Sequence, residues 1–325
     1  MTNRILDFSQ AACRLRIRND CLEVTSNDDS VVATIALGDI ESVVLSHPQI
    51  SVTQAVLGRL SSYGIAVVCC DERQRPVGMM LPLEGNQSQR ARFRAQSELS
   101  EPRRKRMWQT IVQAKICAQG QVLQEFDGLD YGLAAMAKRV GSGDPRNVEA
   151  QAARRYWPLL FPEERFRRRD DEDVRNHLLN YGYAVLRAAV TRRLCGAGLH
   201  PSFSLHHSSP YNTFPLADDV MEPFRPAVDR IVRLESERRL AAGEELSLDA
   251  AAKKAVIGAL TMRYRVEGES RTLLDVLSRH CQVLASSIME KNVIYSIPEW
   301  RAELRKDVTR AVSDHVDIRD VRSTG

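Results

Sequence analysis

The chain has 325 residues, enough for two modest domains or for one domain with an appendage. Its 43% hydrophobic and 27% charged residues are typical of a soluble globular protein. No apolar run approaches the roughly 20 residues that span a bilayer, and the first residues do not form a secretory signal. We therefore expect a cytoplasmic protein without a membrane segment. The seven scattered cysteines include no CxxC pair, which argues against a zinc ribbon or a disulfide framework.

Residues 1–82 are predicted to form a β-rich domain. Residues 13–18 alternate strictly between apolar and polar, and Asn19-Asp20 supplies the turn into the next strand at 21–24. One helix is expected near 51–62 and a buried strand at 65–70. Together these elements indicate a small β-sandwich with one helix.

The rest of the chain is predicted to be helical. Residues 83–100 are polar and charged, which indicates a linker that leads into the first helix. From 101 to 300 apolar residues recur at helical spacing, with the final helices near 246–265 and 273–291, and the charged residues 301–325 are expected to form a partly disordered tail. The sequence thus predicts an α+β protein, in which a small N-terminal β-sandwich-like domain precedes a larger all-helical domain.

One predicted helix carries an acid on its inner face. Asp144-Pro145 is expected to open this helix, because Asp caps free N–H groups and Pro suits the first helical position. The helix should stop at Trp157, before the proline that follows. Glu149 lies on the same face as two alanines, which leave room beside the carboxylate. A site role is therefore favoured over the ordinary alternative, pairing with a neighbouring arginine.

The stretch from Gly198 to Pro226 holds two adjacent histidines, two adjacent aspartates and a glutamate. One of the aspartates is predicted to cap a helix, and Pro226 to kink it and free the carbonyl of Glu222. Asp219 and Glu222 are three residues apart and therefore face the same side. Glu149, a histidine and a second carboxylate from this stretch would together supply the donors typical of a Mg²⁺ or Mn²⁺ site. Sets of two acids and a histidine also arise by chance.

The net charge of +4 is modest, but the basic residues gather in two short segments. A solvated helix face is the ordinary explanation for either segment alone. Two such segments that bracket a candidate metal site favour a polyanionic ligand. The first segment contains Arg90, Arg92, Arg94, Arg103, Arg104, Lys105 and Arg106, and the second contains Arg165, Arg167, Arg168 and Arg169.

Several motifs resemble those of a known family. The motifs are NYGYAVL at 180–186, SLHH at 204–207, LADDVMEPFRP at 216–226, and RNVEA at 146–150 followed by ARRYW at 153–157. They resemble the CRISPR-associated integrase/endonuclease, the larger of the two universal adaptation proteins, which inserts new spacers into CRISPR arrays with a small partner. The resemblance covers nearly the whole chain. The MEPFRP run is also similar to the branch that accompanies single-protein RNA-guided effectors.

The resemblance implies a set of site residues. Glu149, His207 and Glu222 would be the catalytic residues and the metal ligands. His207 is selected because the family's histidine lies fifteen residues before the acid of the MEPFR run. His206 would then be a core residue or a support for the ligand. Asp219 would be a nearby second acid that supports the metal or its waters.

The resemblance also implies an activity and partners. A 3′-hydroxyl of captured DNA would attack a phosphodiester at the repeat boundary, assisted by Mg²⁺ or Mn²⁺, and the absence of a GxxxxGK[ST] loop agrees with a reaction that consumes no ATP. The implied partners are double-stranded DNA, a second copy bound through the β-domain as a homodimer, and the small acquisition protein in a heterohexameric complex. A nuclease that only resolves branched DNA and an inactive DNA-binding subunit remain alternatives. The residues expected to hold DNA phosphates are Arg103, Arg104, Arg106, Arg165 and Arg168.

Overall fold

The computed structural model describes residues 4–9, 11–72, 76–80, 88–162, 166–168, 170–207, 209–290 and 292–303. By their contacts these residues divide into an N-terminal unit, 4–80, and a C-terminal unit, 88–303. Each unit is described by itself.

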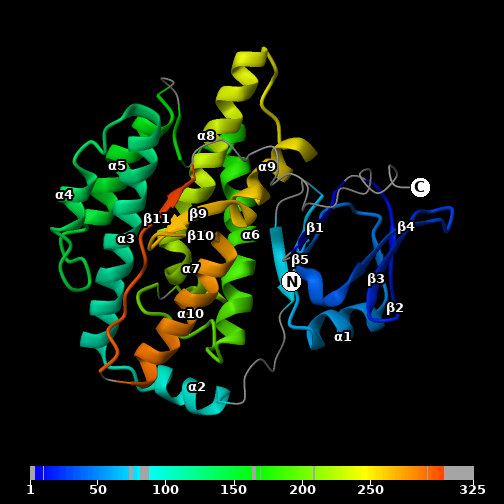
Figure 1. Ribbon diagram of the computed structural model, residues 1–325, viewed down its shortest axis with the longest axis horizontal. Helices are drawn as coiled ribbons and strands as arrows, with labels where there is room; N and C mark the ends of the chain where they lie inside the picture. Colours follow the sequence, from blue (N-terminus) through cyan, green and yellow to red (C-terminus); the bar gives the residue numbers. More distant parts are fainter. Residues whose placement is uncertain are drawn as a thin grey trace. The chain divides into compact units, whose positions relative to one another are not determined.

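The described residues of the N-terminal unit form two four-stranded sheets and a helix (Figure 1). The strands are β1 (Arg4–Phe8), β2 (Arg14–Arg18), β3 (Cys21–Thr25), β4 (Val31–Ala36), β5 (Ile40–Leu45), β6 (Ser51–Val52), β7 (Ala66–Cys70) and β8 (Pro76–Met80). One sheet has the order β1-β5-β7-β8, with β8 antiparallel to β7 and the other neighbours parallel. The second has the order β4-β3-β2-β6, with only the β2–β6 pair parallel. The helix is α1 (Gln54–Ser62), and a short 3-10 turn, η1 (Leu37–Asp39), precedes β5.

The predicted turn at 19–20 and the predicted helix are both present in this unit. Asn19 and Asp20 have positive φ angles of 49° and 57°, and Ile17 pairs with Leu22 across the turn, so the predicted hairpin is confirmed. The helix begins three residues later than predicted, because the Thr53 side chain accepts a hydrogen bond from an N–H of the first turn. One buried apolar cluster draws residues from both sheets and from α1.

The C-terminal unit is mainly helical. Its longer helices are α2 (Gln89–Ser97), α3 (Glu101–Asp127), α5 (Val148–Leu160), α6 (Val174–Gly196), α8 (Arg225–Ala242), α9 (Ala250–Thr261) and α10 (Leu273–Met289). Its short elements are α4 (Leu133–Ala137), α7 (Pro215–Met221) and the 3-10 turn η2 (Glu222–Phe224). Helix α6 packs against α7, α8, α9 and α10, while α3 packs against α4, α5, α8 and η2 (Figure 1). These two helices therefore contact most of the unit's other helices, while α2 and the strands β9 and β10 contact α10.

The prediction that this part of the chain is all helical is wrong. A three-stranded antiparallel sheet has the order β10-β9-β11, built from Arg263–Val266 (β9), Glu269–Thr272 (β10) and Trp300–Ala302 (β11). In β9 exposed and buried residues alternate, and the residues that follow it, Glu267 and Gly268, have positive φ angles of 51° and 84°. Helix α9 ends at Thr261, four residues before the predicted end at 265, and the turn at 267–268 folds the chain back from β9 into β10 as a hairpin.

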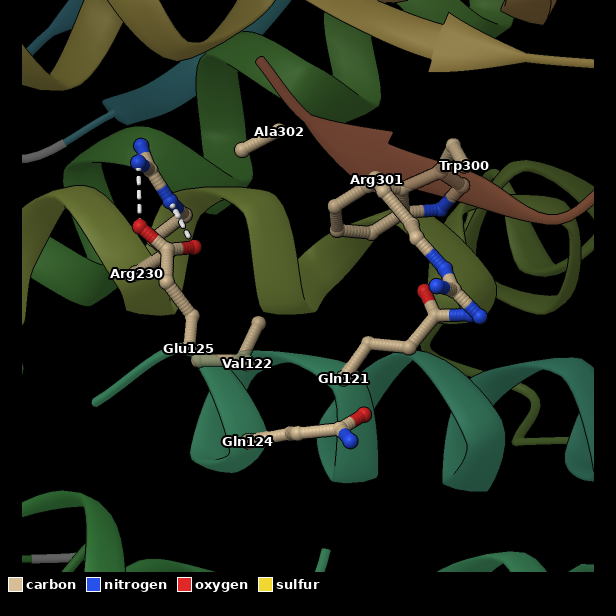
Figure 2. A pocket seen from close by; sticks show the side chains of 8 residues that line it. All are labelled: Gln121, Val122, Gln124, Glu125, Arg230, Trp300, Arg301 and Ala302. Carbon is tan, nitrogen blue, oxygen red and sulfur yellow. Dashed lines mark hydrogen bonds and ion pairs between the residues drawn. The ribbon is translucent and has the colours of Figure 1, made fainter. Parts of the chain in front are cut away.

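The third strand of this sheet, β11, comes from the last described residues and pairs with β9. Figure 2 shows a pocket between α3 and β11, with Trp300 and Arg301 facing Gln121. At its far end Arg230 makes two 2.6 Å hydrogen bonds to the Glu125 carboxylate. The sequence predicts a partly disordered tail at 301–325, but Arg301 and Ala302 belong to β11, and the residues after 303 lie outside the described part of the chain.

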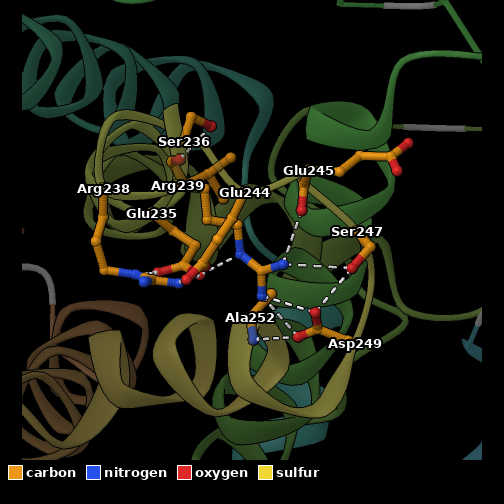
Figure 3. A network of polar contacts seen from close by, with 10 residues as sticks. Glu235, Ser236, Arg238, Arg239, Glu244, Glu245, Ser247, Asp249 and Ala252 are labelled. Carbon is orange, nitrogen blue, oxygen red and sulfur yellow. Dashed lines mark hydrogen bonds and ion pairs between the residues drawn. The ribbon is translucent and has the colours of Figure 1, made fainter. Parts of the chain in front are cut away.

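The corner between α8 and α9 is held by a polar network (Figure 3). The Arg239 guanidinium, whose side chain is 7% exposed, bonds Glu235 on its own helix and both carboxylate oxygens of Asp249. Asp249 also caps α9 through the N–H of Ala252. This arrangement satisfies the buried charge and fixes where α9 starts. Among the described residues no helix combines the length and apolarity that crossing a membrane needs.

Two further helix ends differ from the prediction. α5 continues through Pro158 to Leu160, so it does not stop at Trp157. The missing proline N–H costs little there, because only the final turn lies beyond it. Near Pro226 the chain forms η2 rather than a kinked helix, and the Glu222 carbonyl accepts a hydrogen bond from the backbone N–H of Arg225 instead of being freed.

Candidate metal centre

Glu149 lies in the first turn of α5, and the turn before it fixes its backbone. Residues 144–147 form a tight turn in which Asp144 and Asn147 have φ angles of 48° and 51°, so the helix begins at Val148 rather than at Asp144. The Asp144 carboxylate nevertheless accepts 2.9 Å hydrogen bonds from the N–H groups of Val148 and Glu149. The expected start is therefore wrong: Asn147 is the N-cap, with its side chain accepting a hydrogen bond from the N–H of Ala150, and Asp144 supports the first turn from outside the helix.

Lys115 of α3 joins the two glutamates predicted as ligands. Its Nζ lies 2.5 Å from Glu149 Oε1 and 2.6 Å from Glu222 Oε2. Because both oxygens contact the same nitrogen, they lie within about 5 Å of each other. Burial lowers the pKa of the Lys115 ammonium, but the two carboxylates outweigh that effect and raise it above its usual value. Two carboxylates from separate elements thus converge on one cation.

Glu222 begins η2, and its side chain is 7% exposed. Burial opposes its ionisation, but Arg225, with Nε 3.0 Å from Oε1, and Lys115 lower the pKa of Glu222 to about 2. The contact of Oε2 with Lys115 is an ion pair without a directed hydrogen bond. Glu222 is therefore an ionised, buried carboxylate with a lone pair still available to a cation.

Asp219 of α7 organises the loop that carries the two histidines. Its buried carboxylate accepts hydrogen bonds from the backbone N–H groups of Leu205, His206 and His207, at 2.7, 3.0 and 3.2 Å. The expectation that Asp218 or Asp219 caps the helix is wrong, since α7 has no side-chain cap and both residues lie inside it. Asp219 instead ties the loop to the helix.

The same carboxylate orients the His207 ring. Asp219 Oδ1 lies 2.6 Å from His207 Nδ1, which leaves Nε2 as the ring nitrogen open to a cation. The Asp219 hydrogen bond raises the pKa of His207, and the charges of Glu222 and Glu149 add to this effect against the cost of burial. The three predicted ligands are therefore close enough for the charges of the two glutamates to affect the protonation of His207.

His206 seats the loop on α3. Its ring stacks on Trp108 at a centroid distance of 4.3 Å and an angle of 2°, and the edge of His207 meets the same indole at 5.4 Å. Trp108 is 1% exposed. The stack therefore anchors the histidine loop to the helix that also carries Lys115.

Glu149, Glu222 and His207 have the types of donor atom that bind a divalent cation. Two carboxylates and an imidazole suit Mg²⁺ or Mn²⁺. As arranged, no three His, Cys, Asp or Glu side chains of the described residues are close enough to hold an ion. Lys115 stands between the two glutamates, and His207 is engaged by Asp219.

A cavity of about 360 Å³ opens beside Glu222 and Lys115. The guanidinium groups of Arg168 and Arg225 line it, and they lie over the Tyr183 ring at 5.2 and 4.5 Å from its centroid. Cations held on an aromatic ring, next to a carboxylate pair, form a surface that suits a phosphate group.

A buried acid completes that cavity. Asp229 accepts hydrogen bonds from the hydroxyl groups of Tyr183 and Tyr156. Burial raises the pKa of Asp229 to about 6, although both hydroxyls and the nearby arginines act in the opposite direction. Asp229 therefore titrates in a range where a carboxyl group is normally fully ionised.

The structure places the predicted phosphate-binding arginines in different settings. Arg104 and Arg106 are exposed on α3. Arg103 instead hydrogen-bonds the carbonyl oxygens of Ser287 and Glu290, at the end of α10. Arg168 lines the cavity and also bonds two asparagine side chains of α6. The predicted Arg165 lies outside the described residues.

The sequence reasoning missed Lys115, Arg225 and Asp229 as functional residues. Lys115 lies among apolar residues that recur at helical spacing, and its α3 neighbours Ile111 and Ile116 are fully buried. A lysine on the buried face of a helix is the signal that marks such a residue, because burial of an ammonium requires a partner.

The comparisons with solved structures define the class of fold. A casposase bound to integration product has a TM-score of 0.75 and 20% identity to this chain, with 98% of this chain and 97% of that chain covered. A Cas6-RT-Cas1–Cas2 complex gives a TM-score of 0.72 at 20% identity, and this chain corresponds to 36% of the chain matched there. The fold is therefore Cas1-like.

Sequence comparison is more specific. The model of the family described as CRISPR associated protein Cas1 matches residues 8–261. The CRISPR-associated endonuclease Cas1 of Neisseria meningitidis serogroup C (strain 8013) is 35% identical over 283 residues, which cover 86% of this chain and 90% of that protein. The chain belongs to the Cas1 family.

Proposed function

We propose that this protein inserts new spacer DNA into a CRISPR array by metal-dependent transesterification. Membership of the Cas1 family makes it a DNA endonuclease and integrase of spacer acquisition. The observation that carries the local assignment is the convergence of Glu149 and Glu222 on one buried cation, beside His207. We assign Glu149, His207 and Glu222 as the catalytic metal ligands.

The reaction exchanges one phosphodiester for another. The 3′-oxygen of the incoming strand forms a P–O bond as the P–O bond at the repeat boundary breaks, so no nucleoside triphosphate is required. A bound Mg²⁺ or Mn²⁺ would lower the pKa of the attacking hydroxyl and neutralise charge on the phosphate.

The chain's own residues supply position and charge. Asp219 holds the His207 ring at a fixed angle, and the buried pairs around Glu222 keep that carboxylate ionised. Arg168 and Arg225, on the wall of the adjacent cavity, would receive the non-bridging oxygens of the phosphate. Preorganised charge of this kind is the largest contribution expected in phosphoryl transfer.

The proposal also covers the protein's partners, its branch of the family and its cellular compartment. We propose a homodimer that pairs through the N-terminal β-domain, residues 1–82, and joins a small acquisition protein in a heterohexameric complex on double-stranded DNA. The similar fold within a Cas1–Cas2 complex supports the small partner. The MEPFRP run supports placement in the branch beside single-protein effectors, and the scattered cysteines agree with the cytoplasm.

A substitution at Glu149 tests the assignment. Glu149→Ala should abolish DNA joining and cutting in Mg²⁺ or Mn²⁺ while DNA binding stays within about twofold, because one ligand is lost and the basic surface is retained. Glu101→Ala is a matched control: Glu101 also lies in the first turn of a helix and pairs with a lysine, but is exposed. If chemistry survives in Glu149→Ala, the ligand assignment fails. If wild-type protein binds DNA without any chemistry, the chain is an inactive DNA-binding subunit.

A further inference from the structure

Lys115 is the one lysine of α3 that points into the site. Its side chain is 15% exposed, on a helix face whose neighbours Ile111, Val112 and Ile116 are fully buried. Burial of a charged ammonium is unfavourable unless ionised partners are near. The position of Lys115 therefore depends on what it contacts.

Its partners are the two glutamates that the proposed function assigns to the metal. The ammonium lies 2.5 Å from one carboxylate and 2.6 Å from the other, between Glu149 and Glu222. A divalent cation shared by these two groups would need the same oxygens, at about 2 to 2.2 Å. It would also be repelled by a positive charge at that distance. The ammonium and the metal therefore exclude each other.

We propose that Lys115 is a built-in competitor of the metal, so that metal loading requires the displacement of its ammonium from between the two glutamates. This inference rests on the proposed function, since it takes Glu149 and Glu222 as metal ligands. The ammonium holds the carboxylates together without a metal, and it weakens metal binding by the free energy of the contacts that must be broken. Lys115 is a positioning residue in this role.

The displaced Lys115 ammonium can turn into the adjacent cavity. Lys115 lines the same cavity as Arg168 and Arg225, where a DNA phosphate would sit. A flexible four-carbon stem allows the ammonium to change partners without a backbone movement. When DNA and the metal bind, the Lys115 ammonium would leave the two carboxylates and contact a DNA phosphate instead.

The test uses the full-length protein and Mn²⁺ alone. Lys115→Met keeps the length and apolar contacts of the side chain but removes the charge. We expect its Mn²⁺ dissociation constant, measured by calorimetry, to fall at least tenfold below that of the wild type. In EDTA its melting temperature should fall, because two buried carboxylates are left facing each other, and Mn²⁺ should raise it by more than it raises that of the wild type.

Lys105→Met is the matched control. Lys105 lies on the same helix and contacts Glu101 at 2.7 Å, but both side chains are more than half exposed. Its Mn²⁺ affinity should match the wild type. If Lys115→Met fails to fold, Lys115→Gln replaces it, because the uncharged amide NH₂ group can donate hydrogen bonds to the two carboxylates.

Separate results overturn the inference and the proposed function. Unchanged or weaker Mn²⁺ binding in a folded Lys115 variant overturns the competitor role and leaves Lys115 as a structural ion pair. Wild-type Mn²⁺ binding that Glu149→Gln does not weaken would instead remove the assigned metal site, and the inference with it.

Discussion

At the scale of single residues, the buried carboxylate of Asp219 determines the geometry of the histidine loop. It accepts three backbone hydrogen bonds from residues 205–207 and contacts the His207 ring. Each of these bonds fixes the backbone of one loop residue against the same carboxylate. Neighbouring Asp218, by contrast, contacts Arg187 and Asn212 on the outer side of the helix.

Asp219→Asn should therefore impair the site far more than Asp218→Asn. An amide can accept fewer of these bonds, and its NH₂ group opposes the loop N–H groups. We expect Mn²⁺ affinity and DNA joining to fall by about 10- to 100-fold in Asp219→Asn. Calorimetry and a joining assay on both variants check this. Equal effects of the two substitutions would mean that the loop contacts do not govern the ligand.

Asp229 should leave a signature in the pH dependence of stability. Its pKa is raised from 3.8 to about 6, so the folded protein holds this proton more tightly than the unfolded chain. The resulting stabilisation is full below the unfolded pKa and is lost as pH rises through about 6. Two pKa units correspond to roughly 3 kcal/mol.

Asp229→Asn removes that titration. Relative to the wild type, the free energy of unfolding of the variant should rise by about 2 to 3 kcal/mol between pH 4 and pH 7. Urea denaturation across that range measures the difference. A difference that stays flat with pH would show that Asp229 titrates normally.

Some site residues could be predicted from the sequence and others could not. Glu149, His207 and Glu222 lie in recognisable motifs, so resemblance located them. The role of Lys115 arises only when α3, α5 and η2 meet, and no spacing along the chain encodes that meeting. Asp219 was expected near the metal, but the three N–H groups that it binds belong to a loop whose path the sequence does not reveal.

At the scale of elements, α6 packs so closely against α8 and α9 that one position admits only glycine. A Cβ built at Gly182 would lie 2.5 Å from Val228 Cγ1 and 2.6 Å from Val256 Cγ1. Both neighbours are fully buried. This close approach accounts for the glycine in the NYGYAVL motif and sets the distance between the helix that carries Tyr183 and the helix that carries Asp229.

Gly182→Ala should destabilise the protein by about 1 to 3 kcal/mol, because the added methyl group forces the helices apart. Val228→Ala in the same chain should recover part of the loss. Gly258→Ala is the control: it lies inside α9 with nothing within 4 Å, and should stabilise by roughly 0.5 to 1 kcal/mol. Chemical denaturation compares the variants. A neutral Gly182→Ala would contradict the close packing.

Element prediction succeeded where the signal was local. The 19–20 turn follows from its Asn-Asp pair, and the mainly helical character of the chain after residue 100 follows from apolar residues at helical spacing. The β9–β11 sheet escaped prediction because each strand has only three or four residues, and Trp300 pairs with Val266 from a distant part of the chain. Short strands leave too few residues to distinguish their alternation from a helix end.

At the scale of the whole molecule, the account requires a DNA surface in addition to the site. Arg104 and Arg106 are exposed on α3, whereas Arg103 is engaged with α10 carbonyl oxygens. Only the first two are therefore expected to reach phosphates freely. Such contacts position DNA and release counterions, and they make affinity depend on salt.

Replacing Arg104 and Arg106 together by alanine should reduce the slope of log affinity against log salt by about 2, one per lost phosphate contact. Fluorescence anisotropy with a short duplex measures the slope. Arg18→Ala, an exposed arginine of the N-terminal unit, should leave the slope within error. An unchanged slope in the double variant would identify these arginines as an ordinary solvated helix face.

The central claim is that the site joins DNA strands, and an integration assay tests it most directly. The protein and its small acquisition partner are mixed with a short duplex bearing free 3′-hydroxyl ends and a supercoiled plasmid that contains a repeat, in Mn²⁺ or in EDTA. We expect covalent joining at the repeat boundary that requires both the metal and the 3′-hydroxyl. Cutting of branched DNA without any joining, under the same conditions, would contradict the account and favour a branched-DNA nuclease.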